Sequence, residues 1–333
     1  MLIHKNDQPI VILTGHRKSG TSLLHRLFDG VNSLNSYPVD ISVLYAYFPY
    51  FTSDSALSDK QLESRLHLVV SRSLEYLLTH NPSAVDIGKY TKLLKTEIVG
   101  ANLRSRYDIL EAIRESWSKY NGISSNSLPF LFKETSQSIF LERFLSMYPN
   151  LKMISVVRDP RDNFAAIFDG VNRYYSKMGE GELESISSLI NRGRMDMLSA
   201  AMNQEKYPES FLAIKFEDLV SSPERVLKSI SKFLDIEFDP VMLIPSVFGV
   251  GYSGNSHDGN SIIGVSSSRV GAWRSRVSES SIKIIEYWLA KEMDVWGYQL
   301  EFSEAQSHKE FSGFYEQYNS RYFYSDSFVM EEG

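Results

Sequence analysis

The chain contains no cysteine among its 333 residues. This absence excludes disulfide bonds, thiolate metal sites and cysteine nucleophiles, and it is typical of proteins from a reducing compartment. The sequence also lacks any uninterrupted apolar run of the roughly 18 residues that a membrane span needs. The apolar segment Pro9–Leu13 is too short for the core of a signal peptide. We therefore expect a soluble, cytoplasmic protein without a membrane span.

Positive charge is not in excess, because the formal net charge is −6. A chain with this balance does not bind nucleic acid broadly, so we expect no nucleic-acid partner. A local basic pocket for a small anion remains compatible with it. Hydrophobic residues make up 43% of the chain, which is ordinary for a globular protein. The sequence therefore predicts a globular fold with a sizeable core.

Short apolar runs rich in β-branched and aromatic residues alternate with amphipathic helical patterns along the chain. The predicted buried strands are Ile10–Leu13, Leu128–Phe132, Lys152–Val157 and Phe211–Phe216. The predicted helices are Ser22–Phe28, Phe140–Met147 and Pro223–Leu234. Alternation of this kind predicts an α/β fold of three layers, in which a mostly parallel sheet lies between helices on both of its faces.

Residues 60–120 interrupt this alternation, and their apolar positions recur at the spacing of a helix face. We predict one domain over residues 1–300 with a helical insertion at about 60–120. An aromatic-rich extension follows at 301–333, where the sequence shows no clean periodicity. The extension either packs on the body of the protein or covers the site. Ser246–Gly271 is rich in glycine, serine and asparagine, and we predict a long loop there.

A glycine-bearing turn, Gly15–Ser22, separates the first predicted strand from the first predicted helix. Backbone N–H groups of such a turn point at an anion, and glycines let the backbone approach it closely. The spacing of its two glycines is that of a Walker A loop, but Thr21 stands where such a loop carries its lysine. The cations are Arg17 and Lys18, before Gly20. The turn either binds a phosphate-like group or is only a basic turn capped by one of its own hydroxyl side chains.

An arginine follows the third predicted strand, in the segment Arg158-Asp159-Pro160-Arg161-Asp162. Pro160 suits the start of a helix, where its missing N–H is not needed. Open α/β sheets bind ligands at the carboxyl ends of their strands, and a guanidinium matches a phosphate with two hydrogen bonds. Arg158 is therefore a candidate phosphate ligand. The alternative is a surface network in which Arg158 or Arg161 pairs with the neighbouring aspartates.

Taken together, His16–Ser22 and Arg158–Asp162 resemble the two nucleotide-binding motifs of the sulfotransferase family. The resemblance implies a P-loop nucleotide-hydrolase-like fold, and it implies 3′-phosphoadenosine 5′-phosphosulfate (PAPS) as co-substrate without a metal ion. It also implies that Arg158 binds the 3′-phosphate and that Lys18 contacts the oxygen bridging phosphorus and sulfur. The residues that it assigns to the 5′-phosphosulfate are Arg17, Lys18, Ser19, Gly20, Thr21 and Ser22.

Two weaker segments agree with this resemblance. Residues 213–219 are similar to the family's Tyr-Glu-Asp-Leu segment near the adenine, with Phe216 in place of the tyrosine. Ser266–Arg274 looks like the loop that closes over the nucleotide in bacterial members. The family's 3′-phosphate motif usually has a serine where this chain has Ala166, so we expect Ser268 or Arg269 to supply the missing contact.

The acceptor must lose a proton, so a general base is needed. Cytosolic members use a histidine at the position of Thr135, whereas members acting on protein tyrosine or glycans use a carboxylate soon after the phosphate-loop helix. Asp40 lies about there, after a turn-forming stretch, 32–38, that we expect to return the chain to the carboxyl edge of the sheet. Glu134 competes for the role, and His257 is a further candidate. Either carboxylate could instead be only a cap or a surface charge.

The sequence thus predicts a sulfotransferase that moves a sulfuryl group from PAPS to a hydroxyl or amine of a glycan, lipid or small molecule. Lys18 stabilises the leaving oxygen, and Asp40 or Glu134 accepts the proton. The insertion at 60–120 is expected to line the acceptor side. The oligomeric state is not indicated.

Two other readings stay open at this point. A P-loop kinase has the same strand–loop–helix, but Thr21 in the lysine position argues against it. A non-catalytic nucleotide-binding protein of the same fold is the second alternative, and the departures at Ala166 and Phe216 favour it.

Overall fold

The computed structural model of the chain separates into two compact units. The positions that the structure describes are 8–41, 58, 60, 74, 78, 81–100, 106–171, 175–179, 181–252, 254 and 264–322. The first unit comprises Met1–Val157, Ser199–Asn255 and Ser261–Ser267. The second unit comprises Arg158–Leu198, Ser256–Asn260 and Ser268–Gly333. The predicted domain boundary at residue 300 stays a prediction.

A five-stranded sheet in the order β2-β3-β1-β4-β5 forms the centre of the first unit. Its strands are β1 (Ile10–Gly15), β2 (Asn35–Asp40), β3 (Phe130–Lys133), β4 (Lys152–Val157) and β5 (Phe211–Lys215). Every neighbouring pair is parallel. The carboxyl ends of the strands therefore share one edge of the sheet, where folds of this class bind their ligands.

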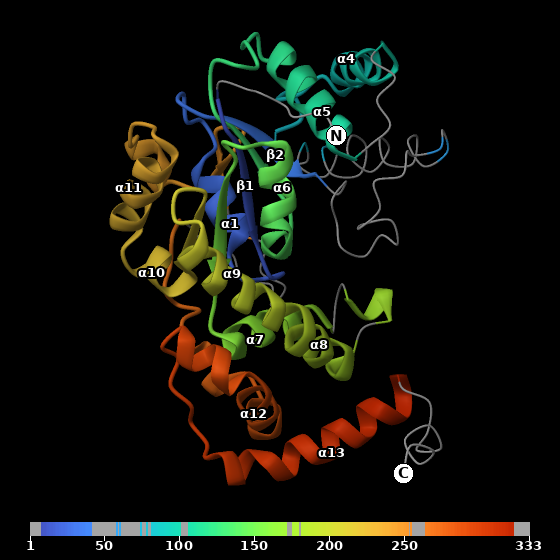
Figure 1. Cartoon of the computed structure of the whole chain (residues 1–333), viewed down its shortest axis with the longest axis vertical. Coiled ribbons are helices and arrows are strands. Elements are labelled where there is room, and N and C mark those ends of the chain that lie inside the picture. Colours follow the sequence, from blue (N-terminus) through green and yellow to red (C-terminus); the bar gives the residue numbers. More distant parts are fainter. Residues whose placement is uncertain are drawn as a thin grey trace. The chain divides into compact units, whose positions relative to one another are not determined.

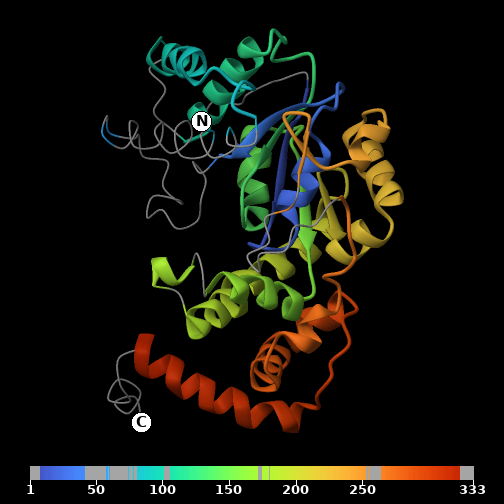
Figure 2. The same cartoon turned by 180° about the vertical axis from the view of Figure 1, so that it is seen from behind.

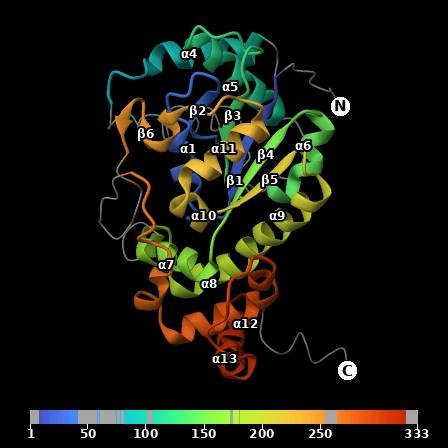
Figure 3. The ribbon, with the colours of Figure 1, turned by 90° about the vertical axis from the view of Figure 1, so that its left-hand side faces the viewer.

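Helices cover both faces of this sheet, which confirms the predicted α/β layering. On one face lie α1 (Thr21–Leu27), α10 (Phe216–Ser221) and α11 (Pro223–Leu234), which stand in front of the strands in Figure 3. On the other face lies α6 (Leu141–Met147), on the opposite side of the strands from α11 in Figures 1 and 2. The bounds of α11 are those predicted from its periodicity.

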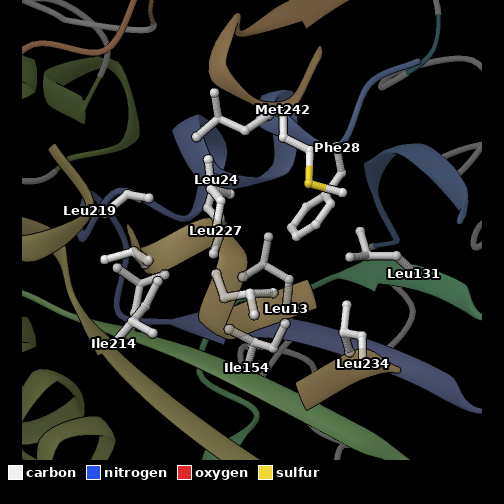
Figure 4. Close-up of a cluster of buried hydrophobic side chains, with 14 of the residues drawn as sticks. Leu13, Leu24, Phe28, Leu131, Ile154, Ile214, Leu219, Leu227, Leu234 and Met242 are labelled. Carbon is white, nitrogen blue, oxygen red and sulfur yellow. The ribbon is translucent and has the colours of Figure 1, made fainter. Parts of the chain in front are cut away.

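The main core of the first unit lies between the sheet and the helices α1 and α11 (Figure 4). Leu13, Ile154 and Ile214 come from three neighbouring strands, and alternate residues of a strand point to the same face. The buried apolar positions of α11 recur at helical spacing and are Val226, Leu227, Ile230 and Leu234. Burial of one such side chain stabilises the fold by about 1.5–3 kcal/mol. This packing fixes the position of the loop between β1 and α1.

The second strand was not expected, because residues 32–38 contain turn-forming residues and a proline. The structure forms β2 over Asn35–Asp40 at the end of the sheet, next to β3. An edge strand tolerates Pro38, and the pairing with β3 is irregular between Ser36 and Asp40. The expected turn is therefore wrong for most of this stretch. Asp40 nonetheless lies at the carboxyl edge, as the last residue of β2.

Helices follow β2 in the described part of the predicted insertion. They are α4 (Ile87–Gly100) and α5 (Arg106–Tyr120). Trp117 of α5 donates from Nε1 to the carbonyl oxygen of Ser36 at 3.1 Å, and its ring meets that of Tyr37 edge-on at 5.5 Å. Tyr90 of α4 also packs edge-on against Trp117. The helical pair is therefore packed on the strand that ends at Asp40.

The second unit is helical throughout its described elements. These include α7 (Pro160–Val171), α8 (Glu182–Ser188), a π-helical turn over Leu189–Gly193, α12 (Glu279–Val295) and α13 (Glu304–Tyr322). The helix α9 (Arg194–Lys206) belongs to the second unit up to Leu198 and to the first unit from Ser199 onward. In the described part of the extension after residue 300, α13 packs on α12, where Phe311 stacks on Tyr287 at 4.6 Å.

The predicted loop Ser246–Gly271 contains a short antiparallel ladder of β6 (Ser246–Val247) and β7 (Val250–Gly251). Asp29 holds this hairpin by accepting hydrogen bonds from the Ser246 hydroxyl and the Gly249 N–H. His257 lies outside the described residues. Among the helices that are described, none has the length and apolar character that crossing a membrane requires.

Candidate functional site

The loop between β1 and α1, residues 16–20, is shaped by close approaches that only glycine allows. A Cβ on Gly15 would lie 2.5 Å from the carbonyl oxygen of Val156 in the neighbouring strand. A Cβ on Gly20 would lie 2.4 Å from the ring of Phe216, and the φ of Gly20 is 106°. Both glycines of the predicted motif are therefore required by local geometry. We call residues 16–20 with Thr21 and Ser22 the phosphate loop.

Lys18 adopts a backbone conformation that is uncommon for a side-chain-bearing residue, with φ of 64°. The N–H of Ser19 donates to the carbonyl oxygen of His16 at 3.1 Å, which closes a tight turn around Lys18. A non-glycine residue in the left-handed region costs free energy and persists where the surroundings hold it, often at functional positions. The turn thus fixes the backbone from which the Lys18 side chain extends.

The entry to the phosphate loop is held by the segment that follows β3. Ser136 donates its N–H to the carbonyl oxygen of Gly15 at 3.1 Å, and Gln137 donates its N–H to the hydroxyl of Thr14 at 2.8 Å. Sequence reasoning missed both contacts, because they join positions more than a hundred residues apart. They connect the loop directly to the end of β3, where Lys133 and Glu134 lie.

The phosphate loop fits an anionic group. The hydroxyl of Ser19, which is 2% exposed, makes no hydrogen bond within the described part of the chain. The first turn of α1 contains no acidic residue and its side chains form no cap, so its N–H groups meet no competing carboxylate there. Buried polar atoms of this kind normally have partners. A phosphate oxygen would provide one for Ser19.

Phe216, the first residue of α10, is buried in the core and packs on Gly20. Its ring therefore supports the phosphate loop from the side of β5. The predicted contact of Phe216 with adenine stays a prediction.

The two candidate carboxylates differ in access. Asp40 ends β2 opposite Lys133 of β3, whose ammonium group binds both carboxylate oxygens at 2.7 and 2.6 Å. The Asp40 side chain is 46% exposed, whereas Glu134 is 1% exposed. Glu134 also accepts the N–H of Thr135 at Oε1, at 2.8 Å. Asp40 is therefore a positioned carboxylate that is open to solvent, and Glu134 is a buried one.

A buried histidine stands behind the Asp40 strand. His25 of α1 donates from Nε2 to the carbonyl oxygen of Tyr37 at 2.8 Å. Burial, with the charges of Arg26 and Lys133, holds the pKa of His25 well below its usual value. His25 is thus a neutral packing residue of the first unit.

In the second unit, the two arginines after β4 have different surroundings. Arg161 is enclosed: it donates to both carboxylate oxygens of Asp159, to Glu286 at 2.5 Å, and lies 4.1 Å from the centre of the Trp273 ring. Arg158, which directly follows the last residue of β4, donates from Nη2 to the carbonyl oxygen of Arg269 at 3.2 Å. Arg161 is therefore part of an ion-pair network with Asp159 and Glu286, which is the alternative that the sequence left open for it.

The segment from Ser268 to Trp273 is attached to the start of α7. Asp162 accepts the N–H of Gly271 at 2.6 Å and the N–H of Trp273 at 2.9 Å. Burial raises the pKa of Asp162, against the opposing effects of the Arg158 charge and these two hydrogen bonds. Ser268 and Arg269 thus lie just before the two anchored positions, and the carbonyl oxygen of Arg269 is itself bound by Arg158.

The predicted residues therefore lie in two groups. The first unit contains the phosphate loop, Phe216 and the two candidate carboxylates, and the second contains Arg158, Ser268 and Arg269. Within the described residues there is no group of three or more histidine, aspartate or glutamate side chains that could hold a metal ion.

Comparisons with known proteins are consistent with this geometry. A family model described as "Sulfotransferase family" matches residues 9–240. The sulfotransferase domain from the curacin biosynthetic pathway is 17% identical, with a TM-score of 0.58 over 89% of this chain and 100% of that domain. The sulfotransferase domain of the Synechococcus PCC 7002 olefin synthase is 19% identical, with a TM-score of 0.59 over 89% of this chain and 97% of that one. No curated protein matches the chain. The two structural likenesses show a shared fold.

Proposed function

The chain belongs to the sulfotransferase family, and on that premise we propose that it transfers a sulfuryl group from PAPS to a hydroxyl or amine of an acceptor. The observation that carries the proposal is the phosphate loop. It presents Arg17 and Lys18 in a glycine-bounded turn with the buried, unbonded hydroxyl of Ser19. The rest of the loop assigned to the 5′-phosphosulfate is Gly20, Thr21 and Ser22.

Lys18 is the proposed electrostatic catalyst. When the acceptor oxygen or nitrogen bonds to sulfur, the bond between sulfur and the bridging oxygen breaks, and negative charge grows on that oxygen. A cation fixed beside it stabilises the transition state more than the bound donor, which is the requirement for a rate effect. The held backbone of Lys18 supports this assignment, since it restricts where the ammonium group can lie.

Asp40 is the proposed general base. The acceptor group must release its proton as the new bond forms, and a carboxylate on the carboxyl edge of the sheet can accept it. Lys133 holds Asp40 through both oxygens and leaves nearly half of the side chain exposed. Glu134, as the alternative base, is less accessible. The helices α4 and α5, packed on β2, are the proposed acceptor side.

Arg158 is the proposed ligand of the 3′-phosphate, with Ser268 and Arg269 supplying the contact that Ala166 cannot make. Arg158 directly follows β4, and its Nη2 donates to the carbonyl oxygen of Arg269, so its guanidinium lies beside the segment that would complete the phosphate contact. These roles make PAPS, rather than ATP, the expected donor, because only PAPS carries both the 3′-phosphate and the sulfuryl group.

Incubation of the purified chain with sulfur-labelled PAPS and panels of hydroxyl and amine acceptors tests the function. We expect label to move to one acceptor class and adenosine 3′,5′-bisphosphate to form in equal amount. The Lys18→Ala chain in the same assay is the control for uncatalysed transfer. Tight PAPS binding without transfer to any acceptor would instead identify a non-catalytic nucleotide-binding protein.

A further inference from the structure

Asp162 binds the backbone of a segment that lies far from it in the sequence. Its two oxygens accept the N–H of Gly271, 109 residues later, and the N–H of Trp273, 111 residues later. The residue is in the first turn of α7 and is buried. Hydrogen bonds from backbone N–H groups to a buried carboxylate are charge-assisted and strong. Removal of the carboxylate would leave both N–H groups without their acceptor.

Two further contacts and a glycine turn shape the same segment. Arg158 donates to the carbonyl oxygen of Arg269. Gly271 turns the chain with φ of 70°, and a Cβ there would lie 3.1 Å from a guanidinium nitrogen of Arg274. Trp273 is buried against Ala165 of α7 and is flanked by Arg161. Besides its own turn at Gly271, the backbone from Arg269 to Trp273 is therefore held by Arg158 and by α7.

We propose that Asp162 is a positioning residue for donor binding. It holds the segment from Ser268 to Trp273 against α7, so that Ser268 and Arg269 contact the 3′-phosphate that Arg158 binds. This inference rests on the proposed function. Ala166 lies on the same helix and has no hydroxyl that could bind the 3′-phosphate. In this proposal the missing contact to the 3′-phosphate comes instead from the segment that Asp162 holds.

Binding of two nucleotides that differ only in the 3′-phosphate distinguishes a role of Asp162 in donor binding from a role in stability alone. Adenosine 3′,5′-bisphosphate carries the 3′-phosphate, and adenosine 5′-monophosphate is the same molecule without it. The ratio of their dissociation constants, measured by calorimetry on one preparation, reports the 3′-phosphate contacts alone. A partly unfolded preparation changes both measurements equally, so the ratio is insensitive to a general loss of stability.

The test compares Asp162→Ala and Asp162→Asn with Asp169→Asn. Asp169 is a matched control, because it lies on the same helix but pairs with a side chain, that of Arg276. We expect the preference for the bisphosphate to fall by about tenfold in Asp162→Ala. Asp162→Asn keeps one acceptor oxygen and should show a smaller fall. Asp169→Asn should keep the wild-type ratio.

The possible outcomes are distinguishable. If the wild-type chain prefers the bisphosphate and Asp162→Ala keeps that preference in full, the inference is overturned while the proposed function stands. If the wild-type chain binds the two nucleotides equally, the proposed function itself fails. If Asp162→Ala does not fold, the ratio of the two dissociation constants is measured on Asp162→Asn, and an unchanged ratio there overturns the inference.

Discussion

The phosphate loop of the first unit and the Arg158–Asp162 segment of the second unit hold their cations by different means. In the loop, backbone geometry does so: two glycines allow close approaches, and Lys18 has a positive φ. In the segment, buried side chains do so, since Asp159 and Glu286 enclose Arg161 while Asp162 anchors a distant loop. Because the surroundings differ, removal of Lys18 from the loop and removal of an arginine from the segment should affect different properties of the protein. Substitution of Lys18 or Asp40 in the first unit should change turnover, and substitution of Arg158 or Arg161 in the second unit should change affinity or stability.

The largest effect is expected from Asp40→Asn, which keeps the size of the side chain and removes the base. Turnover should fall by about 10²–10⁴-fold, while affinity for adenosine 3′,5′-bisphosphate stays near the wild-type value. Steady-state kinetics at saturating PAPS, with calorimetry for the product, measures both. Glu134→Gln is the matched control. An inactive Glu134→Gln chain beside an active Asp40→Asn chain would transfer the role to Glu134.

Lys18→Ala should lower kcat by roughly 10²–10³-fold, because its charge acts mainly when the bridging oxygen becomes anionic. Binding of the bisphosphate product should weaken much less. Lys206→Ala removes an equal charge from an exposed surface pair with Glu142 and should leave kcat unchanged. A Lys18→Ala chain that loses activity only through a raised KM for PAPS would place Lys18 in binding and remove the contrast with Arg158.

The two arginines of the second unit, Arg158 and Arg161, should differ in the property that their substitution changes. Arg158→Ala should weaken nucleotide binding by roughly 1.5–3 kcal/mol, as expected for a lost charge-assisted phosphate contact. Arg161→Ala should instead lower the free energy of unfolding by about 3–5 kcal/mol, since Glu286 and Asp159 would be left as buried charges. Calorimetry and denaturant unfolding of both variants measure the two effects. Equal losses of nucleotide affinity would show that the 3′-phosphate is misassigned.

A smaller effect is expected on the pH dependence of the free energy of unfolding, and it comes from His25 in the first unit. The folded state keeps His25 neutral because burial holds its pKa well below the unfolded value of about 6.5. The unfolded chain therefore binds one more proton once the pH falls below about 6.5, and the free energy of unfolding falls by about 1.4 kcal/mol per pH unit in that window. His25→Gln should reduce this slope by one proton relative to the unsubstituted chain. Unfolding curves at several pH values between 5 and 7 measure the slope, and an unchanged slope in His25→Gln would contradict the assignment.

The elements whose signal is local could be predicted from the sequence. The bounds of β4 and α11 follow from periodic apolar residues, and the helix after Pro160 follows from the proline itself. The strand β2 could not be recognised, because only an edge position makes Pro38 compatible with a sheet. The helix α13 lacked a visible apolar face, since a serine, Ser307, occupies one of its buried positions.

The candidate site shows the same limit. The glycine spacing around Lys18 identified the phosphate loop, because its geometry depends on neighbouring residues. The sequence left open which arginine is enclosed by carboxylates, because the enclosure of Arg161 depends on Glu286, 125 residues later. The pairing of Asp40 with Lys133, 93 residues later, likewise depends on the strand order β2-β3.

Thermal unfolding in the presence of nucleotides tests the central claim most directly. A ligand bound only by the folded chain stabilises it by RT ln(1 + [L]/Kd), which is about 2.7 kcal/mol at a hundredfold excess over Kd. We expect a raised Tm with PAPS and with adenosine 3′,5′-bisphosphate, and a smaller change or none with ATP. No shift with either adenosine 3′-phosphate compound, beside a clear shift with ATP, would contradict it.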